Sequence, residues 1–248
     1  MSWKNAGCAQ YYNRALEYDD IIKLVGSAKS MDDNFPLAKF RNDMSHDTPL
    51  IAINMGQKGK LSGILNGFMT PVSHPALQFK AAPGQLPAAE IRSDLSLLGE
   101  IEPQNYFIFG KPISASRSPA PHHSLFKEIG LPNVYERFET DNADEIKSVS
   151  ADKSFDGAGV TIPLKLDVIS HIDELSDAAK LIGGVNTIIK VRGSDGTARL
   201  VGDNTDWTEF RKSLTAAGAQ PGSSLIIGSG GTARAAIYAL ESLSYSPV

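Results

Sequence analysis

The sequence predicts an α/β protein, and two observations support that prediction. Short apolar runs alternate with segments of helical periodicity along the chain, a pattern typical of βα units and a parallel sheet. The composition is that of an ordinary globular protein, with 42% hydrophobic and 21% charged residues in a chain of 248. These proportions exclude collagenous, coiled-coil and wholly disordered chains, and the length leaves room for about two domains.

The individual elements follow from the same alternation. Short apolar runs are expected to form strands, in chain order at 21–25, 50–55, 106–109, 134–138, 159–162, 185–191 and 224–227. Segments with a helical pattern lie between them, at 32–42, 87–98, 119–129, 175–182, 206–217 and 232–243. Asp206 and Glu209 place negative charge in the first turn of one of these helices, where the helix dipole favours it.

Two stretches of the sequence mark predicted segment boundaries. Polar residues and a proline at 99–103 separate a helix from the next strand, and a Gly/Pro cluster at 218–222 precedes another strand. We therefore predict three segments, at 1–99, 104–218 and 221–248. The third segment holds about one βα unit, whereas a parallel sheet needs several to cover its faces, so we expect this chain to be truncated.

Charge and cysteine content exclude several classes of protein. Lys and Arg total 24 against 28 Asp and Glu, so the chain carries a net charge of −4 and lacks the basic character of a nucleic-acid binder. Its one cysteine, Cys8, forms no internal disulfide. The N-terminal residues do not read as a signal peptide, and apolar runs such as 49–53 are far too short to span a bilayer. We expect a soluble cytoplasmic protein without a metal site.

A glycine-rich turn follows the apolar run at 224–227. Gly228, Gly230 and Gly231 precede a helical segment, and glycines there let a pyrophosphate approach the backbone at the positive end of a helix. The alternative, a plain turn between a strand and a helix, stays open. A residue that reads the ribose would lie about 20 residues further on, beyond Val248.

The middle segment places small hydroxyl and amide groups, one lysine and one aspartate after its strands, where ligands bind in open α/β sheets. The motifs are 110–119, 160–165, 183–187 and 202–207. A lysine and an aspartate that meet around a ligand hydroxyl could exchange a proton, with the lysine as the tunable member.

The order of these motifs closely resembles shikimate dehydrogenase, from about Tyr106 to the chain end. The resemblance implies that Lys165 and Asp206 form the catalytic dyad that handles the proton of the shikimate hydroxyl. It implies further contacts as well: the substrate carboxylate at Ser116 and Ser118, and the substrate also at Thr161 and Asn186. It also implies that 221–248 is the first βα unit of an NADP-binding Rossmann domain, with NADP at Gly228, Gly230 and Gly231. Without the flanking motif, Lys165 would read as a solvated lysine at a helix start.

The chain departs from the family pattern around this pocket. Ala115 stands where the family usually has histidine, and His123 stands where asparagine is common. Gly159 replaces asparagine, serine or alanine, and Gly184 replaces alanine. Thr208 lies near the place of a frequent glycine. None of these changes removes the dyad, but several touch the expected pocket wall.

The first segment resembles the C-terminal half of type I dehydroquinase, an eight-stranded barrel, through the motifs 53–56, 60–63, 70–72 and 81–85. The resemblance places Lys23 at the Schiff-base position and includes Gln85. Strand alternation points Lys23 inward in a barrel, where a buried lysine suits imine chemistry; the alternative is a solvated lysine on an edge strand. Gly63 stands where the family has the arginine that binds the substrate carboxylate, and the histidine base lies on strands that this chain does not contain. We therefore expect dehydroquinase activity to be absent.

A dehydroquinase fused to a shikimate dehydrogenase is the arrangement of fungal AROM polypeptides and of the quinate repressors derived from them. Gly63, Ala115 and His123 favour the repressor type, a sensor of quinate, shikimate or dehydroshikimate that acts through a transcriptional activator protein and enters the nucleus. The alternative is a fragment of an active AROM-type enzyme with NADP-dependent shikimate dehydrogenase, because Lys165 and Asp206 are intact. A third interpretation is a degraded protein without a ligand.

Overall fold

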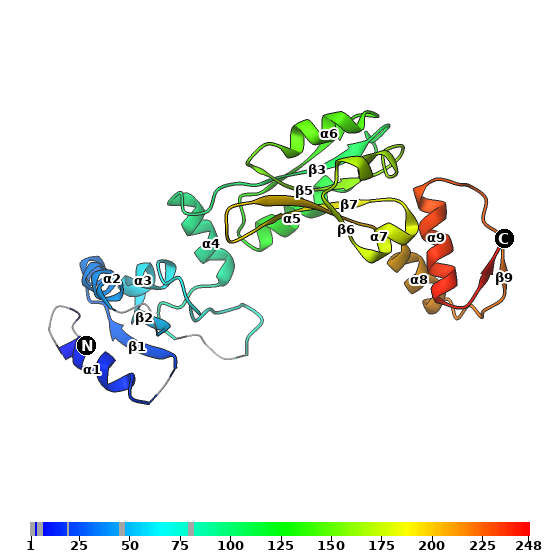
Figure 1. Cartoon of the computed structure of the whole chain (residues 1–248). Coiled ribbons are helices and arrows are strands. Elements are labelled where there is room, and N and C mark those ends of the chain that lie inside the picture. Colours follow the sequence, from blue (N-terminus) through cyan, green and yellow to red (C-terminus); the bar gives the residue numbers. More distant parts are fainter. Residues whose placement is uncertain (1–2, 4–6, 19, 45–47, 79–81) are drawn as a thin grey trace. The chain divides into compact units, whose positions relative to one another are not determined.

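The computed structural model describes residues 3, 7–18, 20–44, 48–78 and 82–248. The chain divides into two compact units (Figure 1): a first unit of Met1–Glu102 with Leu125–Pro132, and a second unit of Pro103–Ser124 with Asn133–Val248. No helix within the described ranges combines the length and apolar character that crossing a membrane requires.

The first unit is built on one pair of parallel strands. Its elements are α1 (Gly7–Ala15), β1 (Ile22–Ser27), α2 (Asn34–Asp43), β2 (Leu50–Met55), α3 (Lys60–Ile64) and α4 (Ala88–Leu97), with short 3-10 turns at Met31–Asp33 and Gln57–Gly59. β1 and β2 are in register with Ile22 opposite Leu50. Because successive side chains on a strand alternate between faces, this pair can pack helices on one side and line a cavity on the other.

The helix-facing side of this strand pair forms the core of the first unit. Its buried members are Trp3, Cys8, Tyr12, Ile22, Leu24, Leu37, Phe40 and Ala52. The indole of Trp3 donates a hydrogen bond from Nε1 to the side-chain oxygen of Asn54 at 2.6 Å, inside the buried region. The Asn54 side chain therefore lies on the core side of β2 with its carbonyl satisfied.

The second unit contains a six-stranded mixed sheet with the strand order β4-β3-β5-β7-β8-β6. The strands are β3 (Asn105–Gly110), β4 (Val134–Glu139), β5 (Phe155–Val160), β6 (Glu174–Leu175), β7 (Thr187–Arg192) and β8 (Ala198–Asp203). β3 pairs in parallel with β4 and β5, and β6 with β8, but β7 is antiparallel to both of its neighbours. The carboxyl ends of β3 and β5 therefore meet at one edge of the sheet.

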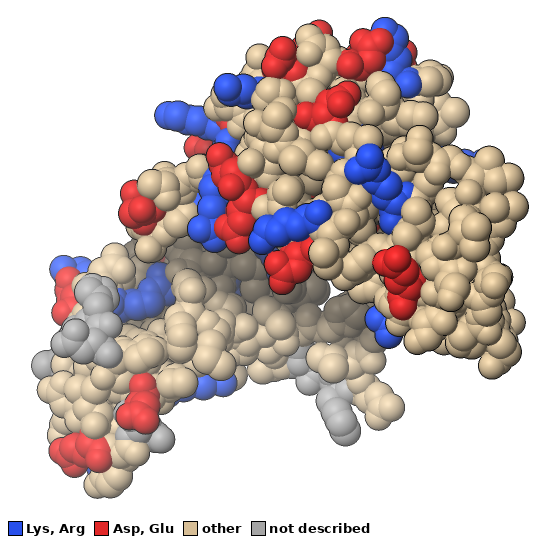
Figure 2. Space-filling model, turned by 45° about the vertical axis from the view of Figure 1, so that its right-hand side comes forward, with Lys and Arg blue, Asp and Glu red and all other residues tan. Residues whose placement is uncertain are grey.

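Helices and a short terminal strand pair complete the second unit. They are α5 (Pro119–Glu128), of which the residues from Leu125 onward belong to the first unit, α6 (Ala143–Ser150), the 3-10 helix Asp167–His171, α7 (Asp177–Ile182), α8 (Asp206–Ala216), β9 (Ser223–Ser224), α9 (Gly231–Ser242) and β10 (Ser246–Pro247). The buried core is apolar: Phe109, Ile146, Phe155, Ala158, Val160, Leu164, Val168, Ala179, Val185 and Ile188. On the face shown in Figure 2, basic and acidic side chains lie interspersed and do not form a patch of one sign.

Capping residues fix the ends of the helices that precede the site. The side chain of Asn142 accepts a hydrogen bond from the backbone of Asp144 at the start of α6. Ser176 caps α7 in the same way, and Gly183 ends that helix with a φ of 67°, a left-handed conformation that glycine adopts without strain. The chain leaves α7 at a defined angle and continues into Asn186 and β7.

The α/β class is confirmed, and several details of the sequence prediction are wrong. The sheet is not purely parallel, because β7 runs antiparallel to β5 and β8. The strand predicted at 159–162 is β5, which ends at Val160, and residues 175–176 precede α7. The strand predicted at 224–227 shortens to β9, and Leu225 and Ile227 are exposed. The sequence analysis did not predict α1, α3, α6 or β8.

Candidate ligand and catalytic sites

Lys165 and Asp206 meet in the second unit although 41 residues separate them in the sequence. Lys165 follows the end of β5, and Asp206 is the first residue of α8. The lysine Nζ lies 2.5 Å from the aspartate Oδ2, and the two side chains are 13% and 24% exposed. This pair is largely withdrawn from solvent, so its mutual attraction is screened less than that of a surface pair.

Asn186 fixes the second oxygen of the same carboxylate. Its amide nitrogen donates to Asp206 Oδ1 at 2.7 Å and to Thr205 Oγ1 at 3.1 Å. Its carbonyl oxygen accepts from the backbone nitrogen of Thr205 at 2.9 Å. Both oxygens of Asp206 therefore have a partner, and the carboxylate is held in one orientation beside the ammonium group.

Asn204 positions the start of α8, a role that the sequence analysis did not assign. This asparagine is fully buried, donates to the backbone oxygen of Gly184 at 2.9 Å and accepts from the backbone nitrogen of Asp206 at 3.1 Å. A buried amide needs hydrogen-bond partners, and here both partners lie in motifs that the sequence analysis singled out. Its place two residues before Asp206 was the available signal.

Ser116 and Ser118 form a separate pair of hydroxyl groups after β3. Their Oγ atoms are 3.4 Å apart, and the backbone nitrogen of Ser118 also approaches Ser116 Oγ at 3.4 Å. The guanidinium of Arg137, from β4, donates through Nε to the backbone oxygen of Ser116 at 3.1 Å. The loop that carries the hydroxyl pair is thus tied to the neighbouring strand.

Thr161 lies one residue beyond β5, and its backbone nitrogen donates a hydrogen bond to the backbone oxygen of Phe109 at 2.8 Å. A Cβ at Gly110 would lie only 2.4 Å from the Thr161 methyl group, so this close approach requires glycine. Among the described residues, no hydrogen bond joins the hydroxyl pair or Thr161 to the lysine–aspartate pair. The structure therefore brings the predicted substrate residues together as two groups: Lys165, Asn186 and Asp206 in one, and Ser116 and Ser118 in the other.

The glycine turn at 228–231 packs against Lys165. Gly228 has a φ of 135°, Gly230 precedes α9 in an extended conformation, and Gly231 is its first residue. A Cβ at Gly231 would lie 3.0 Å from the Cβ of Lys165. Lys165 Nζ also donates to Thr232 Oγ1 at 3.3 Å, a contact that the sequence analysis did not foresee. The N-terminus of α9 and the lysine–aspartate pair therefore form one structural neighbourhood.

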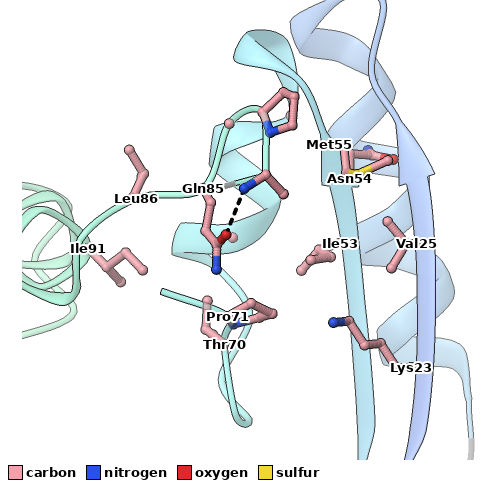
Figure 3. Close-up of a pocket in the computed structure, with 15 residues that line it drawn as sticks. Lys23, Val25, Ile53, Asn54, Met55, Thr70, Pro71, Gln85, Leu86 and Ile91 are labelled. Carbon is pink, nitrogen blue, oxygen red and sulfur yellow. Dashed lines mark hydrogen bonds between the residues drawn. The ribbon is translucent and has the colours of Figure 1, made fainter. Parts of the chain in front are cut away.

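A cavity of about 170 Å³ in the first unit lies beside the other lysine of interest (Figure 3). Lys23 and Val25 from β1 line it together with Ile53 from β2, and the Lys23 ammonium group points into the space. Lys23 is exposed, so the expected burial of its charge is not present in this structure. Its surroundings in the cavity are mainly apolar.

Gln85 also lines this cavity, but loop contacts hold its amide. Its Oε1 accepts from the backbone nitrogen of Ala82 at 3.1 Å, and its Nε2 donates to the backbone oxygen of Val72 at 2.9 Å. Gly63, from α3, lines the same cavity, and a Cβ there would meet no atom of the described residues within 4 Å. The position at which the family pattern has an arginine therefore has room for a side chain.

The part of the chain that the structure describes contains no cluster of three or more His, Cys, Asp or Glu residues that could hold a metal ion.

Two protein families match this chain, one around Lys23 and one around Lys165. Residues 1–102 match type I 3-dehydroquinase, and residues 108–188 match the shikimate dehydrogenase substrate binding domain. The chain thus carries a dehydroquinase-like segment followed by a shikimate dehydrogenase-like segment, the arrangement of an AROM-type fusion.

Solved structures agree with this arrangement. Over 99% of its length the chain is 48% identical to the dehydroquinate dehydratase and shikimate dehydrogenase from S. pombe AroM, with a TM-score of 0.75, and covers 47% of that chain. It is 34% identical to shikimate dehydrogenase from Aquifex aeolicus, with a TM-score of 0.50, over 58% of this chain and 54% of that one.

Shikimate 5-dehydrogenase from Thermus thermophilus, solved in complex with NADP(H) and shikimate, is 33% identical over 58% of this chain and 54% of that one, with a TM-score of 0.49. The chain spans about half the length of each of these three structures.

Proposed function

We propose that the second unit binds a shikimate-type ligand and that Lys165 and Asp206 exchange a proton with one of its ring oxygens. The observation that carries this proposal is the dyad itself: an ammonium group 2.5 Å from a carboxylate whose other oxygen is held by Asn186. The similarity of the whole chain to S. pombe AroM supports the ligand class. Together these give the function of a shikimate dehydrogenase of AROM type.

The proton chemistry follows from the arrangement of the dyad. In the direction of carbonyl reduction, the Lys165 ammonium donates a proton to the ligand oxygen as that oxygen becomes a hydroxyl. Asp206 accepts a hydrogen bond from Lys165 Nζ, and Asn186 keeps the carboxylate turned toward the lysine. General acid catalysis of this kind requires the acid within hydrogen-bond reach of the reacting oxygen. The low exposure of Lys165 also favours proton transfer, because it excludes water from the ammonium group.

The carboxylate of the ligand is assigned to Ser116 and Ser118, with Thr161 and Asn186 as further contacts. Hydroxyl groups donate to carboxylates, and each hydrogen bond to a charged group contributes about 1.5–3 kcal/mol. The bond from Arg137 to the backbone of Ser116 favours a loop that is ordered before the ligand arrives.

The turn before α9 is suited to NADP. Gly228 adopts a φ that side chains rarely permit, and a Cβ at Gly230 would meet no atom within 4 Å, so the helix N-terminus is open to a phosphate group. Gly228, Gly230 and Gly231 would hold the pyrophosphate, and the cofactor, when bound, would supply the hydride. We also propose segment boundaries at 1–99, 104–218 and 221–248.

Titration calorimetry of the 248-residue chain with shikimate tests this function. Asp206→Ala is expected to weaken binding about tenfold or more, because it removes a ligand contact and the counter-charge of Lys165. Lys23→Ala, in the other unit, is the matched control and should leave the affinity unchanged. Absence of shikimate binding by the parent chain, or equal affinities for all three proteins, would contradict the proposal.

A second candidate is ligand sensing of the quinate-repressor type, with quinate, shikimate or dehydroshikimate as the signal and a transcriptional activator protein as the partner. The observation that favours it is Gly63, because Lys23 is the one cation among the described residues that line the cavity and no arginine stands there for a ligand carboxylate. NADPH consumption with dehydroshikimate separates the two candidates. Turnover that Lys165→Met abolishes identifies a dehydrogenase, and tight binding without NADPH consumption identifies a sensor.

A further inference from the structure

Tyr135 lies next to the hydroxyl pair in the second unit and has no role in the proposed chemistry. It is the second residue of β4 and is only 5% exposed. Its phenol oxygen faces Gly159, and the Ser118 hydroxyl is among the groups that interact with it. A polar group at the far end of a buried ring is thus directed at one of the two residues assigned to the ligand carboxylate.

Two histidines from α5 hold the tyrosine in place. The ring of His122 stacks on the ring of Tyr135 with 4.1 Å between centroids and 17° between planes. His122 Nδ1 also lies 2.7 Å from the backbone oxygen of Ser118. His123 Nε2 accepts a hydrogen bond from the backbone nitrogen of Tyr135 at 3.0 Å. The phenol therefore has little freedom to turn away from Ser118.

Gly159 provides the space for the phenol oxygen. A Cβ at this position would lie 3.0 Å from Tyr135 Oη, tighter than most Cβ contacts, so a side chain there would require the hydroxyl to shift by a few tenths of an ångström. His123 and Gly159 are both positions at which the sequence departs from its family pattern. In the structure, both departures contact the same tyrosine.

The protonation state suits a hydrogen-bond role. Burial raises the pKa of Tyr135 above its ordinary value, and this effect outweighs the contacts with Gly159 and Ser118 that lower it. The phenol therefore keeps its proton at neutral pH and carries both a donor and acceptor sites toward Ser118.

From this geometry we propose that Tyr135 is a positioning residue: its hydroxyl orients Ser118 Oγ for the carboxylate of the bound ligand. This inference rests on the proposed function, because it takes Ser116 and Ser118 as the carboxylate contacts. It adds a residue on β4 to a site otherwise built from the ends of β3, β5 and β7, and it explains why the space over Gly159 is kept free of a side chain.

The test compares shikimate with its uncharged methyl ester in titrations of the full chain. Tyr135→Phe keeps the ring stacked on His122 and removes only the hydroxyl. We expect it to weaken shikimate binding about threefold to tenfold, the range for one hydrogen bond, and to leave binding of the ester unchanged. Gly159→Ala should act in the same direction. Tyr106→Phe is the matched control, because the Tyr106 hydroxyl contacts Asp156.

A double variant tests whether Tyr135 acts through Ser118. Once Ser118→Ala is present, Tyr135→Phe should have no further effect on shikimate affinity, since coupled residues are not additive. Additive losses, an equal loss for shikimate and its ester, or a parent-like Tyr135→Phe would each overturn the inference while the proposed function stands. A parent chain that does not bind shikimate would overturn both.

Discussion

Lys23 in the first unit and Lys165 in the second unit both match a lysine of a family motif, yet their surroundings differ. Lys165 is 13% exposed and has a carboxylate at 2.5 Å and a hydroxyl at 3.3 Å. Lys23 is exposed, faces a mainly apolar cavity, and forms no ion pair with another described residue. The difference teaches that a motif places a lysine, whereas its partners decide which chemistry the lysine can perform.

The neighbouring glycines reinforce this contrast. At Gly231 a Cβ would lie 3.0 Å from the Cβ of Lys165, so the surroundings of that lysine would have to shift to accept a side chain. At Gly63 a Cβ would meet no atom of the described residues within 4 Å, so the described packing leaves that position free for a side chain. The second unit has a closely packed site, and the first unit has room left beside its lysine.

The largest expected effect concerns the independence of the two units. Phe155→Ala removes a fully buried ring from the core of the second unit and should cost about 3–5 kcal/mol of its stability. The chain has two tryptophans, Trp3 in the first unit and Trp207 in the second. Urea unfolding followed by fluorescence in Trp3→Phe and Trp207→Phe backgrounds should show a shift only where Trp207 reports.

Leu37→Ala, in the core of the first unit, is the reciprocal control. It should cost about 2–5 kcal/mol and move only the transition that Trp3 reports. If each substitution moves both transitions equally, the two units unfold as one body, and their contrast is not one of independent parts.

Gly63→Arg should reduce the difference between the two lysines by adding a cation to the cavity that Lys23 lines. The position faces the cavity, has open space at Cβ, and lies in helix α3, where arginine is also a better helix former than glycine. A guanidinium that bonds a ligand carboxylate should add about 1.5–3 kcal/mol of binding energy for dehydroquinate, measured by calorimetry. Gly63→Gln is the uncharged control. An equal gain from both variants would contradict the role assigned to charge.

Alkaline pH should affect the second unit through two tyrosines. Burial raises the pKa of Tyr106, and its contact with Asp156 raises it further; burial likewise raises the pKa of Tyr135. Because both values lie above those of the unfolded chain, stability is fully present below about pH 10 and falls as pH rises through the folded-state pKa.

The expected slope is less than about 1.4 kcal/mol per pH unit for each tyrosine. The slope is obtained from the midpoint of urea unfolding, which the fluorescence of Trp207 reports at each pH. The series starts at about pH 9, below the ordinary tyrosine pKa. Tyr106→Phe should flatten the profile, whereas Tyr18→Phe, at an exposed position in the first unit, should not change it. An unchanged slope in Tyr106→Phe would remove that tyrosine from the explanation.

The smallest expected effect is an unchanged mass. Dehydroquinate with borohydride should leave no adduct on the parent chain, because the described residues that line the cavity include no cation besides Lys23 to hold a ligand carboxylate. Mass spectrometry decides, with Lys23→Ala as the control. A stable adduct that maps to Lys23 would show that the dehydroquinase-like segment retains its imine chemistry.

The sequence was most informative where chemistry requires particular residue types. Lys165, Asn186 and Asp206 were predicted to act together from motifs far apart in the chain, and the structure joins them by hydrogen bonds. Thr232 and Tyr135 were not predicted, because their roles depend on which elements pack side by side. No local pattern encodes such a neighbour.

The fold was predicted least well where polar residues form regular structure. α6 was missed because its residues are mostly polar, although Asn142 followed by Glu145 is a helix N-terminus signal in the sequence. β8 was missed because its apolar run is short: Leu200 and Val201 lie between Arg199 and Asp203. The strand predicted at 224–227 shortened to β9, which pairs only with β10 and leaves Leu225 and Ile227 exposed.

Gly231 and Lys165 pack against each other where α9 begins. A Cβ on Gly231 would lie 3.0 Å from the Cβ of Lys165, so a side chain there would require the lysine stem or the helix to shift by a few tenths of an ångström. Any change that moves the N-terminus of α9 is therefore expected to move the Lys165 side chain as well. Under the proposed function, a substitution in the glycine turn would alter the position of the proposed acid even without a cofactor.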